Sequence, residues 1–168
     1  MDLDREGTIR IVREIEATDP LWEGVDLPLA GPVSVDLSVS ATATGQVLAR
    51  GSVEAKMRFE CRRCLVEVVP ELHEDLALVW APRDEFPGEE EDEEQGEIRV
   101  LELGVGSLDM GPAVREELVL ATPRFVVCRE DCQGLCPRCG INRNEESCDC
   151  TLEEPDPRWD ALRALKED

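Results

Sequence analysis

The sequence predicts an α+β protein, in which an antiparallel β meander packs with one or two helices and is followed by a C-terminal cysteine-rich lobe. Three observations lead to this class. Alternating apolar and polar runs fill the first half of the chain, helical patterns begin only after residue 106, and six of the eight cysteines lie between residues 128 and 150. A chain of 168 residues has room for one domain with a modest core and a small additional lobe.

Strands are predicted where apolar and polar side chains alternate, because a strand with one buried face has a period of two residues. In residues 33–40 the odd positions are apolar and the even positions are polar, and residues 49–59 repeat the pattern. Thr44-Gly45-Gln46 has the composition of a turn between them. Residues 66–80 predict a long third strand, which completes an antiparallel meander. One further short strand each is expected at residues 8–15 and 97–103.

Two helices are predicted in the second half of the chain. Asp109 or Ser107 can cap a helix over residues 112–121, which begins with a proline and is followed closely by another. A second helix is expected near the C-terminal end, where Asp156 is suited to the N-cap and Pro157 to the first helical position.

The predicted organisation has four parts, of which the second is an acidic loop. Between residues 84 and 97 there are nine acidic residues and no basic one, so this segment can bury little and is expected to be solvated and disordered. It is either a solubilising insertion or a docking segment for a basic partner. The parts are residues 1–83 (sheet with the first cysteine pair), 84–97 (acidic loop), 98–127 (short strand and helix) and 128–168 (cysteine-rich lobe and C-terminal helix).

Charge restricts the classes of partner. The chain has 18 lysines and arginines against 39 aspartates and glutamates, a formal net charge of −21. Such a surface repels phosphate at long range and attracts basic proteins, which excludes nucleic-acid binding through a uniformly basic face but leaves room for a local basic patch. The start of the chain is charged before any apolar stretch, and no run approaches the roughly 18 apolar residues of a membrane span. We therefore expect a cytoplasmic protein that does not bind a membrane.

The cysteines carry the most specific chemical signal, and three explanations compete for them. A disulfide framework requires an oxidising compartment, which the absence of a secretory signal argues against. A thioredoxin-like redox pair requires a βαβ setting, which the predicted meander around Cys61 does not offer. Metal is the best account, because two residues between thiolates let one tight turn direct both sulfurs at a single ion. Cys136-Pro137-Arg138-Cys139-Gly140 is the stronger knuckle and Cys61-Arg62-Arg63-Cys64 the weaker.

Eight thiolates divide into two four-cysteine zinc sites, although spacing alone does not fix the pairing. The division that we favour joins Cys61 and Cys64 to Cys128 and Cys132. The other site then contains Cys136, Cys139, Cys148 and Cys150. A site closed by four thiolates leaves no position for a reactive water, so structural zinc and no enzymatic activity are expected.

Other candidate residues have ordinary interpretations beside functional ones. Arg58, Arg62 and Arg63 could form a basic edge that contacts RNA or a partner, but compensation of thiolate charge is the favoured interpretation of the arginines near the cysteines, because it needs no partner. His73, the sole histidine, is expected to be a surface or half-buried residue rather than a zinc ligand. The three tryptophans are expected to pack in the core or lobe: Trp22, Trp80 and Trp159.

Several motifs together resemble the YceD family of large ribosomal RNA subunit accumulation proteins. They are Cys61-Arg62-Arg63-Cys64-Leu65, the helix end at residues 117–123, the run at residues 131–140, Cys148-Asp149-Cys150 and the Asp156-Pro157-Arg158 helix start. Their order and spacing extend from about Val33 to the C-terminus. Arg143 departs from the pattern, which has an apolar residue before Asn144.

The resemblance implies a non-catalytic factor in the synthesis, processing or stability of large-subunit (23S) ribosomal RNA. Two modes of action follow. The chain is either an adaptor or holding chaperone for a basic ribosomal protein or assembly factor, which its charge favours, or an RNA-binding factor that uses the basic edge near Arg62 and Arg63. A thiol redox protein is a weaker third possibility. No small-molecule substrate is expected in any of these roles.

Overall fold

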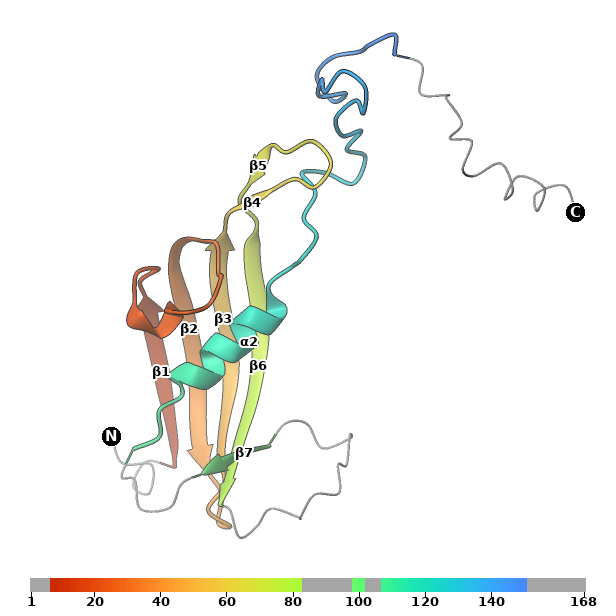
Figure 1. The fold of residues 1–168 in the computed structure, drawn as a ribbon. Coiled ribbons are helices and arrows are strands. Elements are labelled where there is room, and N and C mark those ends of the chain that lie inside the picture. The colour runs from red at the N-terminus through yellow and green to blue at the C-terminus, as the bar shows by residue number, and fades with distance from the viewer. Residues whose placement is uncertain (1–6, 83–97, 102–106, 151–168) are drawn as a thin grey trace, which may run out of the picture. The chain divides into compact units, whose positions relative to one another are not determined.

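A computed structural model describes residues 7–82, 98–101 and 107–150, which divide into two compact units. The first unit contains the chain up to Phe59 together with Val69–Arg124, and the second contains Glu60–Val68 and the chain from Phe125 onward (Figure 1). This division differs from the sequence-based one, which assigned the first cysteine pair to the sheet domain 1–83. The acidic loop 84–97 and the predicted C-terminal helix lie outside the described residues.

The first unit contains a five-stranded sheet of order β1-β2-β3-β6-β7. Its first four strands are antiparallel neighbours, as the meander prediction required, whereas β7 pairs with β6 in parallel. The mostly antiparallel sheet and one helix confirm the α+β class. The strands are β1 (Thr8–Ile15), β2 (Leu29–Ala41), β3 (Val47–Met57), β6 (Glu71–Pro82) and β7 (Ile98–Leu101).

The long third strand predicted over residues 66–80 is interrupted. It is divided into β5 (Glu67–Val68) and β6, and β5 pairs instead with β4 (Phe59–Glu60) in a separate two-stranded sheet. Pro70 lies in the gap, and a proline cannot donate to a ladder. The small sheet flanks the first cysteine pair on both sides and so sets the base of that turn.

The core of the first unit lies between one face of the sheet and helix α2 (Gly111–Ala121), which crosses that face in Figure 1. Alternate strand residues such as Leu37 and Leu78 meet Val114 and Leu118 of the helix there. The short 3-10 helix η1 (Pro20–Trp22) adds Trp22 to the same core. Trp22 and Trp80 are buried as predicted, and Trp159 lies outside the described residues.

The start of α2 differs in detail from the prediction. Met110 occupies the N-cap position without a side-chain hydrogen bond, whereas Asp109 or Ser107 had been expected there. The Asp109 carboxylate accepts a hydrogen bond from the backbone N–H of Gly111 at 2.9 Å, so it acts from one residue before the cap. None of the helices among the described residues combines the length and apolarity that crossing a membrane requires.

Candidate metal centres

Two turns of the second unit share one backbone geometry. In Cys61–Leu65 the N–H of Leu65 donates to the carbonyl of Cys61 at 2.9 Å, and in Cys136–Gly140 the N–H of Gly140 donates to the carbonyl of Cys136 at 2.8 Å. The fifth residue of each turn has a positive φ, 61° for Leu65 and 76° for Gly140. The sequence predicted this conformation for Gly140; Leu65 adopts it without the freedom of glycine. Each turn brings both of its sulfurs to the same side.

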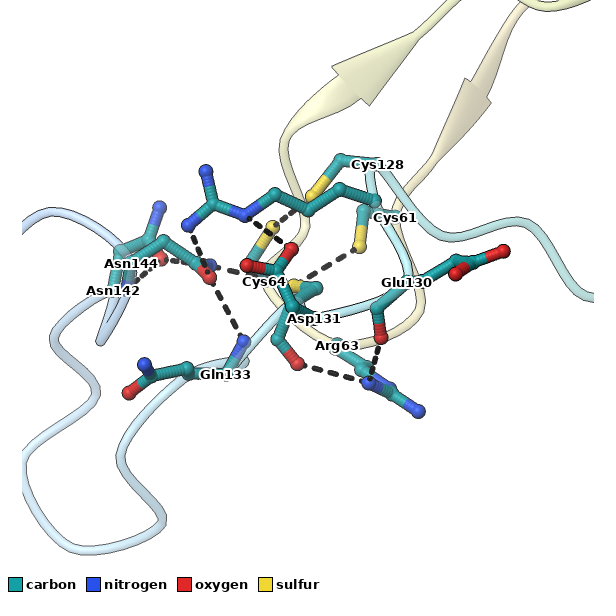
Figure 2. A network of polar contacts seen from close by, with 11 residues as sticks. Cys61, Arg63, Cys64, Cys128, Glu130, Asp131, Gln133, Asn142 and Asn144 are labelled. Carbon is teal, nitrogen blue, oxygen red and sulfur yellow. Dashed lines mark hydrogen bonds and ion pairs between the residues drawn. The ribbon is translucent and has the colours of Figure 1, made fainter.

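The first tetrad consists of four cysteines whose Sγ atoms all lie within 4.8 Å of one another: Cys61, Cys64, Cys128 and Cys132. The Cys61 and Cys132 sulfurs are 3.8 Å apart, and those of Cys64 and Cys128 are 3.6 Å apart. In Figure 2 the labelled cysteines direct their sulfurs toward a common centre. Four thiolates at about 2.3 Å from a tetrahedral ion have sulfurs about 3.8 Å apart. The first tetrad therefore fits a four-thiolate metal site.

The second tetrad consists of four further cysteines whose Sγ atoms also lie within 4.8 Å of one another: Cys136, Cys139, Cys148 and Cys150. Cys136 and Cys139 lie at the tip of a short hairpin, because Leu135 and Asn142 form a β-bridge and the N–H of Cys136 donates to the carbonyl of Ile141 at 2.8 Å; Cys148 and Cys150 come from the segment that follows the hairpin. The two tetrads are the groups that the sequence analysis favoured, and both could hold a metal ion.

Burial differs among the sulfur ligands. In the first tetrad Cys61, Cys64 and Cys132 are buried and Cys128 is exposed, whereas in the second only Cys136 is buried. None of the eight cysteines forms a disulfide. The first tetrad is thus the more enclosed of the two.

The polar surroundings shift the thiol pKa values in opposite directions. Burial raises the pKa of Cys61, but N–H groups of Cys128, Arg63 and Cys64 outweigh it and lower that pKa to about 6. The N–H groups of Cys139 and Arg138 likewise lower the pKa of Cys136 to about 6.

Other thiols of the tetrads have raised pKa values. Desolvation of the Cys128 sulfur and its contacts with the Cys132 and Cys64 thiols raise the pKa of Cys128 to about 12, although the residue as a whole is exposed, and the Cys139 side chain is the main cause that raises the pKa of Cys150 to about 12. Four neighbouring sulfurs cannot all ionise without a cation, whereas a bound metal ion deprotonates its thiol ligands.

Arg63 belongs to the structure of the first tetrad. Its guanidinium donates to the carbonyls of Glu130 and Cys132 at 3.2 and 2.9 Å, and its own carbonyl accepts from the N–H of Leu135 at 2.8 Å (Figure 2). Gly134, with φ of 72°, passes so close that a Cβ there would lie 2.8 Å from the Arg63 carbonyl oxygen. Arg63 therefore ties the first turn to the segment that carries Cys132.

The three arginines singled out from the sequence have different settings. The guanidinium of Arg62 lies 4.1 Å from the centroid of the Phe125 ring, which is 74% exposed. Arg58 belongs to the first unit, whereas Arg62 and Arg63 belong to the second, so a common basic edge stays a prediction. His73 lies in β6, exposed, with Nδ1 3.1 Å from the carboxylate of Glu54, and it is not part of either tetrad.

Sequence reasoning missed the part played by Asn144. Its side-chain N–H donates to the sulfur of Cys132 at 3.3 Å, and its Oδ1 accepts from the backbone N–H of Gln133 at 2.8 Å and from Arg129 at 2.9 Å. A polar residue in a loop is normally read as solvated. The available signals were its position between two ligand pairs and its place in the family pattern next to Arg143.

Comparison with known proteins gives a consistent family match. The profile of a family described as large ribosomal RNA subunit accumulation protein YceD matches residues 49–166, which include all eight cysteines. Uncharacterized proteins of Mycobacterium tuberculosis and Mycobacterium bovis are 33% identical over 130 residues, which is 77% of this chain and 60% of each relative. The matched stretch thus spans less than two thirds of these relatives.

A plant protein matches over a shorter stretch. It is named large ribosomal RNA subunit accumulation protein YCED homolog 1, chloroplastic, from Arabidopsis thaliana, and it is 33% identical over 63 residues, 38% of this chain and 20% of the plant protein. No solved structure matches the chain.

Proposed function

Because the chain belongs to the YceD family of large ribosomal RNA subunit accumulation proteins, we propose that it is a non-catalytic ribosome biogenesis factor that acts in the cytoplasm. In this role it supports the synthesis, processing or stability of large-subunit ribosomal RNA. The observation that carries the proposal is the convergence of all eight cysteines in two tetrads within the family-matched stretch. Such tetrads stabilise a binding surface and do not create a catalytic one.

The ion that suits both tetrads is zinc. Soft thiolates bind Zn²⁺ well, and a tetrahedral set of four leaves no open position for substrate or water. Zinc at such a site supplies folding free energy rather than reactivity. One ion would be held by the first tetrad, Cys61, Cys64, Cys128 and Cys132. A second would be held by Cys136, Cys139, Cys148 and Cys150.

The mode of action that the charge supports best is that of an adaptor or holding chaperone for a basic ribosomal protein or assembly factor. A net charge of −21 attracts such proteins and repels the phosphates of RNA. The setting of Arg63 strengthens this choice, because its guanidinium is engaged by backbone carbonyls of the first tetrad. No membrane and no small-molecule substrate takes part.

Direct RNA contact is the second candidate, and one observation favours it. Arg62 and Phe125 form an exposed cation–π pair, and exposed aromatic and arginine planes are surfaces on which unpaired bases stack. Arg62 thereby joins the predicted basic edge to an exposed aromatic ring.

A binding experiment separates the two candidates. The purified protein is titrated with basic large-subunit ribosomal proteins and, separately, with fragments of large-subunit ribosomal RNA at fixed salt. Under the adaptor proposal, deletion of Glu89–Glu94 weakens binding of the basic protein, whereas Arg62→Ala leaves it unchanged.

The matched control is Arg143→Ala, which removes another exposed arginine of the second unit. The adaptor proposal would be wrong if the protein bound RNA and captured no basic protein. The RNA-binding candidate would then be supported if Arg62→Ala abolished RNA binding and Arg143→Ala preserved it. Arg63 is unsuitable for this test, because its replacement would disturb the first tetrad.

A further inference from the structure

We propose that the two tetrads bind metal cooperatively and that Asn144 is the positioning residue that couples them. The inference rests on the proposed zinc sites and concerns how one site controls the other. Asn144 lies in the loop between Cys139 and Cys148, which are both ligands of the second tetrad, yet its side chain contacts a sulfur of the first.

The orientation of the Asn144 amide is fixed by its neighbours. Its Oδ1 accepts from the backbone N–H of Gln133 at 2.8 Å, and a backbone N–H can only donate. The NH₂ group must therefore be the end that faces Cys132, where the nitrogen lies 3.3 Å from the sulfur, and it also donates to Oδ1 of Asn142 at 2.7 Å. A hydrogen bond from an amide to a thiolate stabilises the charged, metal-binding form of the ligand.

The position of Asn144 depends on the hairpin that carries the second tetrad. Cys132 and Asn144 lie on the two arms at its base, where the N–H of Arg143 donates to the carbonyl of Gly134 at 2.9 Å. Cys136 and Cys139 lie at its tip, and the second tetrad joins Cys139 to Cys148 across the loop that includes Asn144. A filled second tetrad would close this loop, whereas an empty one would leave the loop with fewer constraints.

The two sites are therefore linked in free energy. Metal in the second tetrad holds the Asn144 donor against Cys132 and raises the affinity of the first tetrad, and by reciprocity metal in the first tetrad raises the affinity of the second. Outer hydrogen-bond partners of metal ligands commonly change affinity by about 10- to 100-fold. We expect filling one tetrad to raise the metal affinity of the other by a factor within that range.

The test uses the whole chain and the metals alone. Asn144→Asp keeps an acceptor for Gln133 but removes the N–H donor to Cys132. Asn142→Asp adds the same charge two residues away and keeps the acceptor for Asn144; it removes only the hydrogen bond that Asn142 donates to Glu145, which belongs to neither tetrad. Zinc affinity is measured by competition with a chromophoric chelator. Each protein is also loaded with ¹¹³Cd²⁺, whose NMR shift reports the sulfur ligands of each tetrad separately.

We expect Asn144→Asp to weaken the first tetrad about 10- to 100-fold and to move its ¹¹³Cd resonance, with Asn142→Asp close to wild type. A second variant, Cys139→Ser with Cys148→Ser, empties the second tetrad and should weaken the first by a similar factor. Adding Asn144→Asp to that variant should then have little further effect, because the coupling is already lost.

Two results would overturn the coupling. One is that the zinc affinity of the first tetrad is the same whether or not the second is intact. The other is that Asn144→Asp lowers this affinity by the same factor in the Cys139→Ser, Cys148→Ser variant as in the wild type. Both are distinct from failure of the zinc proposal, in which the wild-type protein itself would bind no metal. Resistance of residues 125–150 to limited proteolysis in the metal-loaded protein shows that the second unit of each variant is folded, and the near-ultraviolet signal of Trp22 and Trp80 reports the first unit.

Discussion

Leu65 shows how much a single backbone conformation contributes to the first tetrad. It has a φ of 61°, the left-handed region that costs a residue with a side chain about 1–2 kcal/mol, and its side chain is 58% exposed. Gly140 has the equivalent position in the other turn without that cost. An exposed leucine in a strained position contributes little to packing, so the strain has no local compensation in the core.

Replacement of Leu65 by glycine should stabilise the first turn. The expected gain is about 0.5–1 kcal/mol, because the relief of strain is partly offset by the greater freedom of glycine in the unfolded chain. Resistance to a zinc chelator, followed by release of metal, measures the effect. Leu65→Val is the matched variant and should make release faster, since a branched side chain tolerates positive φ poorly. Faster release from Leu65→Gly than from Leu65→Val would contradict the assignment.

Asp36 provides a pH-dependent contact on the exposed face of the sheet. The Arg10 guanidinium donates to its carboxylate, with Nε at 2.9 Å, and this hydrogen bond holds the pKa of Asp36 below its ordinary value. A lowered folded-state pKa means that the contribution to stability is present above the unfolded pKa of about 3.9 and is lost as the pH falls through the folded value.

The corresponding measurement is an NMR titration of the Asp36 carboxyl group. Arg10→Met should raise the pKa of Asp36 toward its ordinary value, and Asp36→Asn should flatten the fall in stability between about pH 4 and pH 2. Lys56→Met, which removes a pair with Glu71 elsewhere on the sheet, serves as the control. An Asp36 titration unaffected by Arg10→Met would refute the pairing.

At the scale of elements, the centre of the sheet depends on a residue without a side chain. Gly51 lies in β3 between Leu37 of β2 and Leu76 of β6. A Cβ at this position would lie 1.8 Å from the backbone oxygen of Asp36, a separation that only movement of β2 could relieve. The close approach of β2 and β3 therefore requires glycine there.

Gly51→Ala should lower the free energy of unfolding of the first unit by about 1–3 kcal/mol, because the added methyl group overlaps backbone rather than a side chain that could turn away. Chemical denaturation followed by tryptophan fluorescence measures this change. The control is Ser52→Ala in the same strand, for which we expect less than about 0.5 kcal/mol. Equal effects of the two substitutions would show that β2 and β3 do not approach so closely.

Sequence patterns predicted the elements that depend on local periodicity. The alternation in β2 and β3 identified their buried faces, and the C-x-x-C spacing identified both turns. The parallel pairing of β7 was not predictable in this way. Its Arg99 reaches Glu116 and Glu117 of α2, and such contacts join residues that no local pattern relates.

The candidate site shows the same limit. The two C-x-x-C pairs could be named from spacing, because turn geometry is local, whereas the grouping into tetrads was the favoured one of several divisions. The backbone contacts of Arg63 and the sulfur contact of Asn144 depend on how distant segments fold together, so the sequence interpretation left Arg63 among the candidate partner contacts and gave Asn144 no role. Both residues are polar groups that elsewhere would face solvent.

At the scale of the whole molecule, the two units derive their stability from different sources. The first has a core of buried aliphatic and aromatic side chains that includes Trp22, Leu37 and Trp80. Among the described residues of the second, the buried cluster consists of Cys61, Cys64 and Cys132 with Leu135 packed against it. A cluster of this size and composition calls for a metal or disulfides to stabilise it.

Removal of metal should therefore unfold the second unit and leave the first intact. We expect a strong chelator under reducing conditions to make residues 125–150 sensitive to protease, while the emission of the buried tryptophans of the first unit stays unchanged. Limited proteolysis with mass spectrometry, read beside fluorescence, follows both events. Simultaneous loss of both signals would show that the units unfold together, and resistance of both would show that metal is not structural.

The most direct test of the account is the metal content of the whole chain, purified without chelator and weighed by native mass spectrometry together with a count of free thiols. Two structural sites predict two zinc ions per chain and eight cysteines that are shielded from alkylation until the metal is removed. A protein that contains no zinc and carries its cysteines as disulfides or as freely reactive thiols would contradict it.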